Sequence, residues 1–375
     1  MNKILILGTG NAQVDFIIFC KEQGYEVHTI SYKKEGRGIA YADHFSIINI
    51  IDTDTIEKYV SKHSINLIYT SGSDIAMSAI SEVSERLGLK HFVSLPTALT
   101  CNNKILLRKK LALLNEGTYT IKFSEVTANN DNEKWDLFPA MVKPVDSQGQ
   151  RGVNKVNNKK ELEKALKKAL ENSRTQTAII EEFIDGYEIS VNTYILDNQP
   201  MLYFITERNS FREFPGGIIK SHCYPVTWKL NREKTEKMVM EVCRELGIEN
   251  GPAYFQIKIT SQGDPKIIEV ATRFDGCHLW RLIKLLGGPD LFQVTLNHLE
   301  GKDITGYFSK ESEYKKVTYA ELFFFTQIPY TQMKRDEFDV SPYAVYHEWY
   351  YEDGETIRPM NRFMEKAGYQ ITIEL

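Results

Sequence analysis

Residues 3–95 alternate short apolar runs with segments of helical spacing. The apolar run Lys3–Leu7 ends at Gly8, and the helical pattern of Val14–Gln23 ends at Gly24. This alternation predicts a parallel sheet with helices on both faces. The other elements expected here are strands over 25–31, 45–51 and 65–70 and helices over 55–62 and 75–87, the first of these helices capped by Asp54 or Thr53.

The pattern changes to a mixture of helices and mostly antiparallel strands beyond residue 95, so the fold class expected is α/β followed by α+β. The tail from Tyr307 is aromatic and strand-like, with turns expected at Asp353–Gly354 and at Gly368. We expect four domains, over 1–95, 96–186, 187–305 and 306–375. The elements predicted are helices over 96–114, 159–172, 234–246 and 279–286 and strands over 119–126, 140–145, 178–183, 188–196, 201–207, 254–260 and 266–271.

Composition narrows the function classes. The 375 residues are 42% apolar and 26% charged, with a net charge of −4, so no large basic field indicates nucleic acid. Five scattered cysteines without a Cys-x-x-Cys pair argue against a disulfide framework or a zinc site, and fit a reducing cytoplasm. No apolar stretch approaches the length of a membrane span.

The segment Pro139–Val153 carries the strongest chemical signal. An apolar strand delivers Lys143 into an otherwise buried run, Pro144 ends that strand, and a polar loop with Gly149 and Gly152 follows. A cation on a rigid strand beside free backbone amides suits a polyphosphate, and the alternative is a surface lysine before an ordinary turn. The loop lacks the spacing of the common P-loop.

The connector 179–191 leaves one strand through two carboxylates, turns at Gly186 and enters a second strand. Backbone groups of such a connector can pair with the edge of a purine, beside an apolar wall of Phe183 and Ile184. Glu188 begins the next strand, where it can accept hydrogen bonds from ribose hydroxyls. A strand–turn–strand with surface acids is the plainer interpretation.

The hairpin over 254–271 brings two oxygen-bearing side chains together. With its turn centred between Gln262 and Gly263, Gln256 lies opposite Glu269. Opposed side chains are about 5 Å apart at Cβ, a spacing at which two oxygens can share Mg²⁺. A register slip of one residue would place them on opposite faces.

Basic residues follow the hairpin. Arg273 could neutralise a transferring phosphoryl group, and Arg281 could hold a substrate carboxylate, although a surface salt bridge is an equal alternative. His278 fits a packed histidine better than a catalyst. Lys104 opens a helix before the second lobe, where it could add a second cation.

In this order, the segments resemble the ATP-grasp superfamily of carboxylate–amine ligases, over nearly the whole chain. The tail is similar to the closing subdomain of the L-amino-acid ligase and biotin-carboxylase branch. The resemblance implies a nucleotide site of Lys104, Lys143, Ser147, Gly149, Gly152, Glu181, Glu182, Phe183, Ile184 and Glu188, metal ligands Gln256 and Glu269, and catalytic roles for Lys143, Arg273 and Arg281.

The activity implied by this resemblance is an ADP-forming ligase with ATP and Mg²⁺ as cofactors. A small-molecule carboxylate is activated as an acyl phosphate and an amine then attacks it. The loop Asp146–Gly152 would close over the phosphates. The resemblance implies no nucleic-acid or membrane partner, and it leaves a homodimer open.

Two departures from the family pattern stand out. Many members carry Asn where this chain has Ala271, which cannot coordinate a metal, and Gln256 replaces a commoner acid. A nucleotide-binding protein that has lost catalysis therefore remains an alternative. So does the same fold acting on bicarbonate or on a sugar- or nucleotide-linked amine.

A nicotinamide oxidoreductase is a further alternative, because residues 8–13, Gly-Thr-Gly-Asn-Ala-Gln, partly match the dinucleotide-binding fingerprint. It is disfavoured because Gln13 stands where the dinucleotide fingerprint has Gly or Ala. The second strand also ends without an acid for the ribose.

Overall fold

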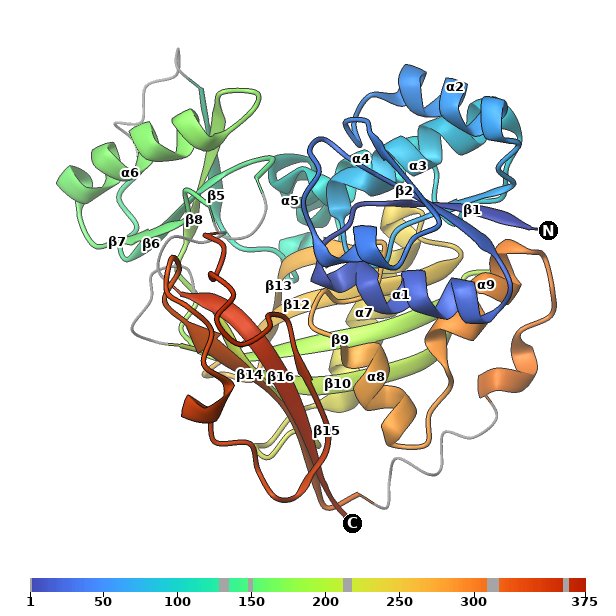
Figure 1. The fold of residues 1–375 in the computed structure, drawn as a ribbon. Helices are drawn as coiled ribbons and strands as arrows, with labels where there is room; N and C mark the ends of the chain where they lie inside the picture. The colour runs from blue at the N-terminus through green and yellow to red at the C-terminus, as the bar shows by residue number, and fades with distance from the viewer. Residues whose placement is uncertain (1, 128–134, 148–150, 212–217, 309–316, 360–363) are drawn as a thin grey trace.

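A computed structural model describes residues 2–127, 135–147, 151–211, 218–308, 317–359 and 364–375. In the described residues, the strands form three sheets, which follow one another along the chain (Figure 1). No helix in these ranges has the length and apolar character needed to cross a membrane.

The first sheet is parallel, as the alternating pattern predicts, with strand order β3-β2-β1-β4. Helix α1 lies on one side of it, and α2 and α3 lie on the other (Figure 1). The strands are β1 (Lys3–Leu7), β2 (Glu26–Ser31), β3 (His44–Ile47) and β4 (Leu67–Tyr69), and the helices are α1 (Asn11–Glu22), α2 (Thr53–His63) and α3 (Asp74–Leu87).

Two helix boundaries differ from the sequence prediction. The N-cap of α2 is Asp52, whose carboxylate accepts from the Thr55 amide, so Thr53 and Asp54 are its first helical residues. The single helix expected over 96–114 is two helices, α4 (Leu95–Asn102) and α5 (Lys104–Leu113). Asn103 is extended between them, and its side chain accepts from the first amides of α5, which ends one helix and starts the next.

The second sheet is a small antiparallel one with order β5-β8-β6-β7, and helix α6 packs against it. This small lobe stands apart from the rest of the molecule in Figure 1. The short strand β7 was not predicted, since three residues carry too little pattern. The elements of the small lobe are β5 (Phe123–Thr127), β6 (Ala140–Pro144), β7 (Asn154–Val156), α6 (Lys159–Asn172) and β8 (Thr177–Glu182).

The third sheet has eight strands in the order β13-β12-β9-β10-β11-β14-β16-β15. Strands β11 and β14 pair, so the tail extends this sheet. Its elements are β9 (Gly186–Leu196), β10 (Gln199–Ser210), β11 (Ile219–Tyr224), α7 (Arg232–Leu246), β12 (Gly251–Thr260), β13 (Pro265–Ala271), α8 (Leu279–Leu285), α9 (Leu291–Leu299), β14 (Tyr319–Gln327), β15 (Ala344–Trp349) and β16 (Glu365–Glu374).

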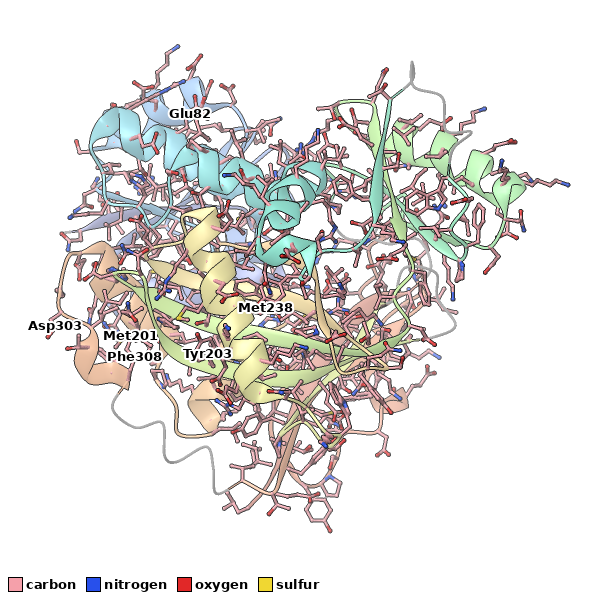
Figure 2. The ribbon with its side chains drawn as sticks, turned by 180° about the vertical axis from the view of Figure 1, so that it is seen from behind. Glu82, Met201, Tyr203, Met238, Asp303 and Phe308 are labelled. Atoms are coloured by element: carbon pink, nitrogen blue, oxygen red, sulfur yellow. The ribbon has the colours of Figure 1, made fainter. Side chains whose placement is uncertain are left out.

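The two faces of the large sheet differ sharply in polarity. One face packs under α7, where the Tyr203 hydroxyl donates to the Glu236 carbonyl over 3.3 Å, and Figure 2 shows Tyr203 and Met238 on this side. Side chains alternate along a strand, so paired residues share a face. What we call the polar face carries Glu188, Ser190, Asn192, Thr206, Arg208, His222, Gln256 and Glu269.

The tail confirms one predicted turn and corrects the other. Asp353–Gly354 forms a turn, but Gly368 lies inside β16, opposite Trp349 of β15. A Cβ at Gly368 would lie 2.3 Å from the Glu348 carbonyl oxygen. The glycine therefore permits a close approach of two strands, a use that the sequence pattern does not distinguish from a turn.

The predicted pairing of Gln256 with Glu269 is confirmed. Near the turn, the observed pairing is shifted by one residue from the predicted pairing, because Thr260 pairs with Asp264 across a three-residue turn. A bulge at Ile268 restores the register, since Ile257 pairs with Ile267 while Gln256 pairs with Glu269.

Arg108 of α5 ties the small lobe to the large sheet. It is 1% exposed. Its Nε donates to Glu181 of β8 over 2.8 Å, and its two terminal nitrogens donate to the carbonyls of Ile267 and Ile268 of β13 over 2.8 and 3.0 Å. One guanidinium therefore satisfies acceptors of both lobes.

We expect Arg108→Met to lower the free energy of unfolding by about 3–5 kcal/mol, because it removes one partner of a buried ion pair. Urea unfolding followed by circular dichroism measures this. The matched control is Lys109→Met, which breaks an exposed pair with Glu125 and should cost about 1 kcal/mol or less. Equal effects of the two substitutions would contradict the role of Arg108.

Candidate functional site

Lys143 lies near the end of β6, where Pro144 stops the strand. Its ammonium is 2.6 Å from a carboxylate oxygen of Glu181, whose other oxygen accepts from Arg108. Burial opposes ionisation of Glu181, but the charges of Arg108 and Lys143 outweigh it and lower its pKa to about 2. Glu181 therefore holds Lys143 in place as a fixed anion.

Lys104 is the first residue of α5, and its ammonium donates to the Ser147 carbonyl over 3.1 Å. Burial lowers the pKa of Lys104, the charge of Lys143 adds to this effect, and the charges of Glu269 and Glu181 oppose it. Lys104 of α5 thus interacts both with Lys143 of the small lobe and with the acid of the large sheet. Lys104 has no carboxylate within ion-pair distance among the described residues.

The loop after Lys143 is anchored at both of its described ends. The Asp146 carboxylate accepts from the hydroxyl of Ser173 and from the amides of Arg174 and Thr175. Gly152 has a φ of +76°, and a Cβ there would lie 2.8 Å from Pro144. Gly149 lies outside the described residues.

The connector between the small lobe and the large sheet has little free backbone. The amides of Glu182 and Phe183 already donate to the carbonyls of Lys122 and Pro139. The Ile184 amide has no backbone partner of this kind among the described residues. The Phe183 ring faces Lys155, whose ammonium lies 3.6 Å from the ring centroid.

The pair Gln256 and Glu269 is partly exposed on the polar face. The Gln256 amide nitrogen donates to Glu188 over 2.6 Å, which leaves the Gln256 carbonyl oxygen as a ligand atom. The Glu269 carboxylate makes no hydrogen bond or ion pair with other described residues. Glu188 itself is held by Arg208 and by Lys258, and although burial raises its pKa, these cations lower it overall.

Arg273 follows β13 and points back to the first sheet. One terminal nitrogen donates to Asp74, which begins α3, and the other donates to the Phe274 carbonyl. Its Nε has no hydrogen-bond partner among the described residues. The guanidinium is thus fixed with one donor to spare.

Arg281 lies on α8 and reaches Asp15 of α1 over 2.7 Å. The rings of Trp280 and Tyr346 flank its guanidinium, 4.6 and 4.0 Å from it. His278 donates to or accepts from Asp15 and Tyr350 and is buried, which fits the packed histidine that the sequence favours.

Sequence reasoning missed three residues that hold these side chains. Asp74 follows a parallel strand that ends in Ser71-Gly72-Ser73, a position where ligands bind in such sheets, and this was the available signal. Asp15 and Arg208 lie within regular elements whose pattern gives no such hint.

A shallow pocket of about 430 Å³ is lined by Gly117, Thr120, Ile121, Lys122, Phe123, Glu182 and Lys266. Of the predicted site residues it includes Glu182 alone. The convergence of Lys104, Lys143 and Glu269 is therefore the better guide to the site.

Comparison with known proteins identifies the fold around these residues. The ATP-grasp domain family matches residues 137–280, which span both halves of the candidate site. Residues 137–280 of this chain match an ATP-grasp domain.

The relatives of this chain are distant in sequence. A formate-dependent phosphoribosylglycinamide formyltransferase of Nostoc sp. is 27% identical over 58% of this chain and 58% of its own length. One from Bacteroides thetaiotaomicron is 26% identical over 64% of this chain and 63% of its own length. The chain thus spans about three fifths of the relatives that it matches.

Solved structures share the fold of the whole chain. An L-amino acid ligase from Bacillus licheniformis superposes with a TM-score of 0.78 at 20% identity, covering 100% of this chain and 93% of that one. An N5-carboxyaminoimidazole synthetase from Staphylococcus aureus, complexed with ADP, gives 0.75 at 17% identity, covering 99% and 93%. The predicted fold class is confirmed.

Glu181 should make the protein sensitive to acid. Its folded pKa of about 2 lies below the model-peptide value of about 4.3, so it stabilises the fold above pH 4.3 and this contribution is lost as the pH falls toward 2. In Glu181→Gln, we expect lower stability at pH 7 and a weaker pH dependence between these values. Urea unfolding at each pH measures this, and an unchanged pH slope would contradict it.

Proposed function

We propose that this chain is an ATP-dependent ligase that activates a small carboxylate and joins it to an amine. The observation that carries the proposal is that Lys104 of α5 interacts both with Lys143 of the small lobe and with Glu269 of the large sheet. Phosphoryl transfer from ATP, with Mg²⁺, would turn an unreactive carboxylate into an acyl phosphate that an amine can attack.

The cations fit a polyphosphate. Lys143 is held by Glu181, whereas Lys104 is partly buried without a carboxylate partner of its own in the described ranges. A buried, unpaired ammonium is costly, and phosphate oxygens would supply the missing negative charge. The Ser147 carbonyl keeps Lys104 directed along the loop.

The oxygen donors fit Mg²⁺, which prefers a few protein carboxylates together with phosphate oxygens. Glu269 offers an unpaired carboxylate and Gln256 a carbonyl oxygen, while the side chain of Ala271 offers nothing. A single negative charge makes a weak site by itself. We therefore expect metal and nucleotide to bind together.

The two arginines fit charge neutralisation and substrate holding. Arg273 is fixed by Asp74 with its Nε unbonded, and Arg281 is fixed by Asp15 between two rings, also with its Nε unbonded in the described structure. Groups held in this way need no reorganisation when charge develops near them. Arg273 would serve the transferring phosphoryl group and Arg281 a substrate carboxylate.

The relatives named formate-dependent phosphoribosylglycinamide formyltransferase favour formate as a second candidate for the acid. ADP release with formate, bicarbonate and each of the twenty amino acids, with and without added primary amines, tests the choice. Nucleotide binding by calorimetry without ADP release from any of these would instead support a protein that has lost catalysis.

We expect Lys143→Ala and Glu269→Ala each to reduce ADP release at least 100-fold, because each removes a charge that acts on the phosphates. Circular dichroism should show that both variants fold, since Glu181 keeps Arg108 as a partner. Lys167→Ala, an exposed lysine of α6, is the matched control and should keep full activity. Near-normal turnover by either site variant would refute the assigned roles.

A further inference from the structure

Three potential metal ligands meet beside the polar face. They are His222 of β11 and Asp275 and Cys277, which follow β13. Their ligand atoms lie within 4.8 Å of one another, and all three residues are buried, with exposed fractions of 0, 5 and 4%. None of them has a part in the proposed ligase mechanism.

Two of these atoms lack any partner. His222 Nε2 and one Asp275 oxygen, Oδ2, make no hydrogen bond in the described structure. A buried polar atom that is left unpaired destabilises the folded chain. Two such atoms, on side chains whose candidate ligand atoms lie within 4.8 Å of one another, point to a ligand that accepts lone pairs from both.

The other atoms of these side chains hold them in position. His222 Nδ1 lies 3.2 Å from the Thr206 hydroxyl, and Asp275 Oδ1 accepts from the Cys277 amide over 2.8 Å. Metal-binding histidines and carboxylates are commonly oriented by second contacts of this kind.

The surrounding charges allow a cation. Burial lowers the pKa of His222 to about 4, so its imidazole is neutral at pH 7 and can offer a lone pair. The charge of the Arg208 guanidinium acts on His222, and this guanidinium is already paired with Glu188. The Lys366 ammonium lies 3.5 Å from Cys277 Sγ, where it can donate a hydrogen bond to a thiolate.

The donor atoms select the kind of ion. Burial raises the pKa of Cys277 to about 12, so an ion must displace the thiol proton, which Mg²⁺ does not do. Nitrogen, oxygen and sulfur ligands together suit Zn²⁺ or Co²⁺. With bonds of about 2.0–2.3 Å, such an ion separates its ligands by about 3.3–3.8 Å, so the side chains need to approach by about 1.5 Å at most.

We propose that His222, Asp275 and Cys277 bind one divalent transition-metal ion, with Zn²⁺ preferred. This site is separate from the Gln256–Glu269 pair. Three protein ligands leave a fourth position open, the arrangement of zinc sites that take a water or a substrate. The ion links β11 to the segment that carries Arg273, and binding exchanges the thiol proton of Cys277 for the metal.

Metal binding to the purified, metal-stripped chain without nucleotide tests this proposal. We expect one equivalent of Zn²⁺ to bind in competition with a chromophoric chelator. Co²⁺ should give a thiolate-to-cobalt absorption band in the near ultraviolet. Cys277→Ser should abolish the band, and Cys277→Ser and His222→Ala should each weaken Zn²⁺ binding at least 10-fold, with no loss of fold by circular dichroism.

Two control variants isolate the site. A second group of potential metal ligands, Glu26, His28 and His44, is more exposed, and His44→Gln removes one of its members. One Glu26 oxygen in this group already contacts Lys3 and His28. Cys223→Ser changes the buried cysteine next to His222. Both should keep the cobalt band. Absence of the band in the unaltered chain, or its survival in Cys277→Ser, would overturn the proposal, and neither result bears on ADP release.

Discussion

A single buried guanidinium joins the parts of this molecule that must act together. Arg108 binds Glu181 in the small lobe and two backbone carbonyls of β13 in the large sheet. Since Glu181 in turn holds Lys143, the position of this ammonium, which we propose binds phosphate, depends on the same contact that joins the lobes. Burying such a charge is costly, and here its partners are one carboxylate of β8 and two carbonyls of β13.

The large sheet divides structural and chemical tasks between its faces. Apolar residues pack under α7, while acids, amides and basic residues line the polar face at matching register positions. Neighbouring strands place these side chains in rows, so Glu188 meets Arg208, Lys258 and Gln256 without any long-range adjustment. A rigid sheet thus orders a dense set of charges that loops could not hold.

Sequence reasoning recovered most of the helices and strands up to α8 and the Gln256–Glu269 pairing, because both follow from periodicity. It did not predict β7, β11 or α9. It placed Gly368 in a turn, since one glycine signals a turn and a close strand approach alike. It could not find Asp15 or the grouping of His222 with Asp275 and Cys277, because these contacts depend on how distant segments fold together. The cysteine spacing alone argued against zinc, and only the packing places one cysteine beside a histidine and an acid.

The bulge at Ile268 constrains how this hairpin can vary in length. A three-residue turn shifts the pairing by one position, and the extra residue in β13 shifts it back before Gln256 and Glu269 meet. The carbonyls that the bulge turns outward are those that Arg108 takes up. An insertion or deletion at the hairpin tip would therefore keep Gln256 opposite Glu269 only if a second change in the hairpin compensated for it. Related chains should preserve this pairing more strictly than the residues of the turn.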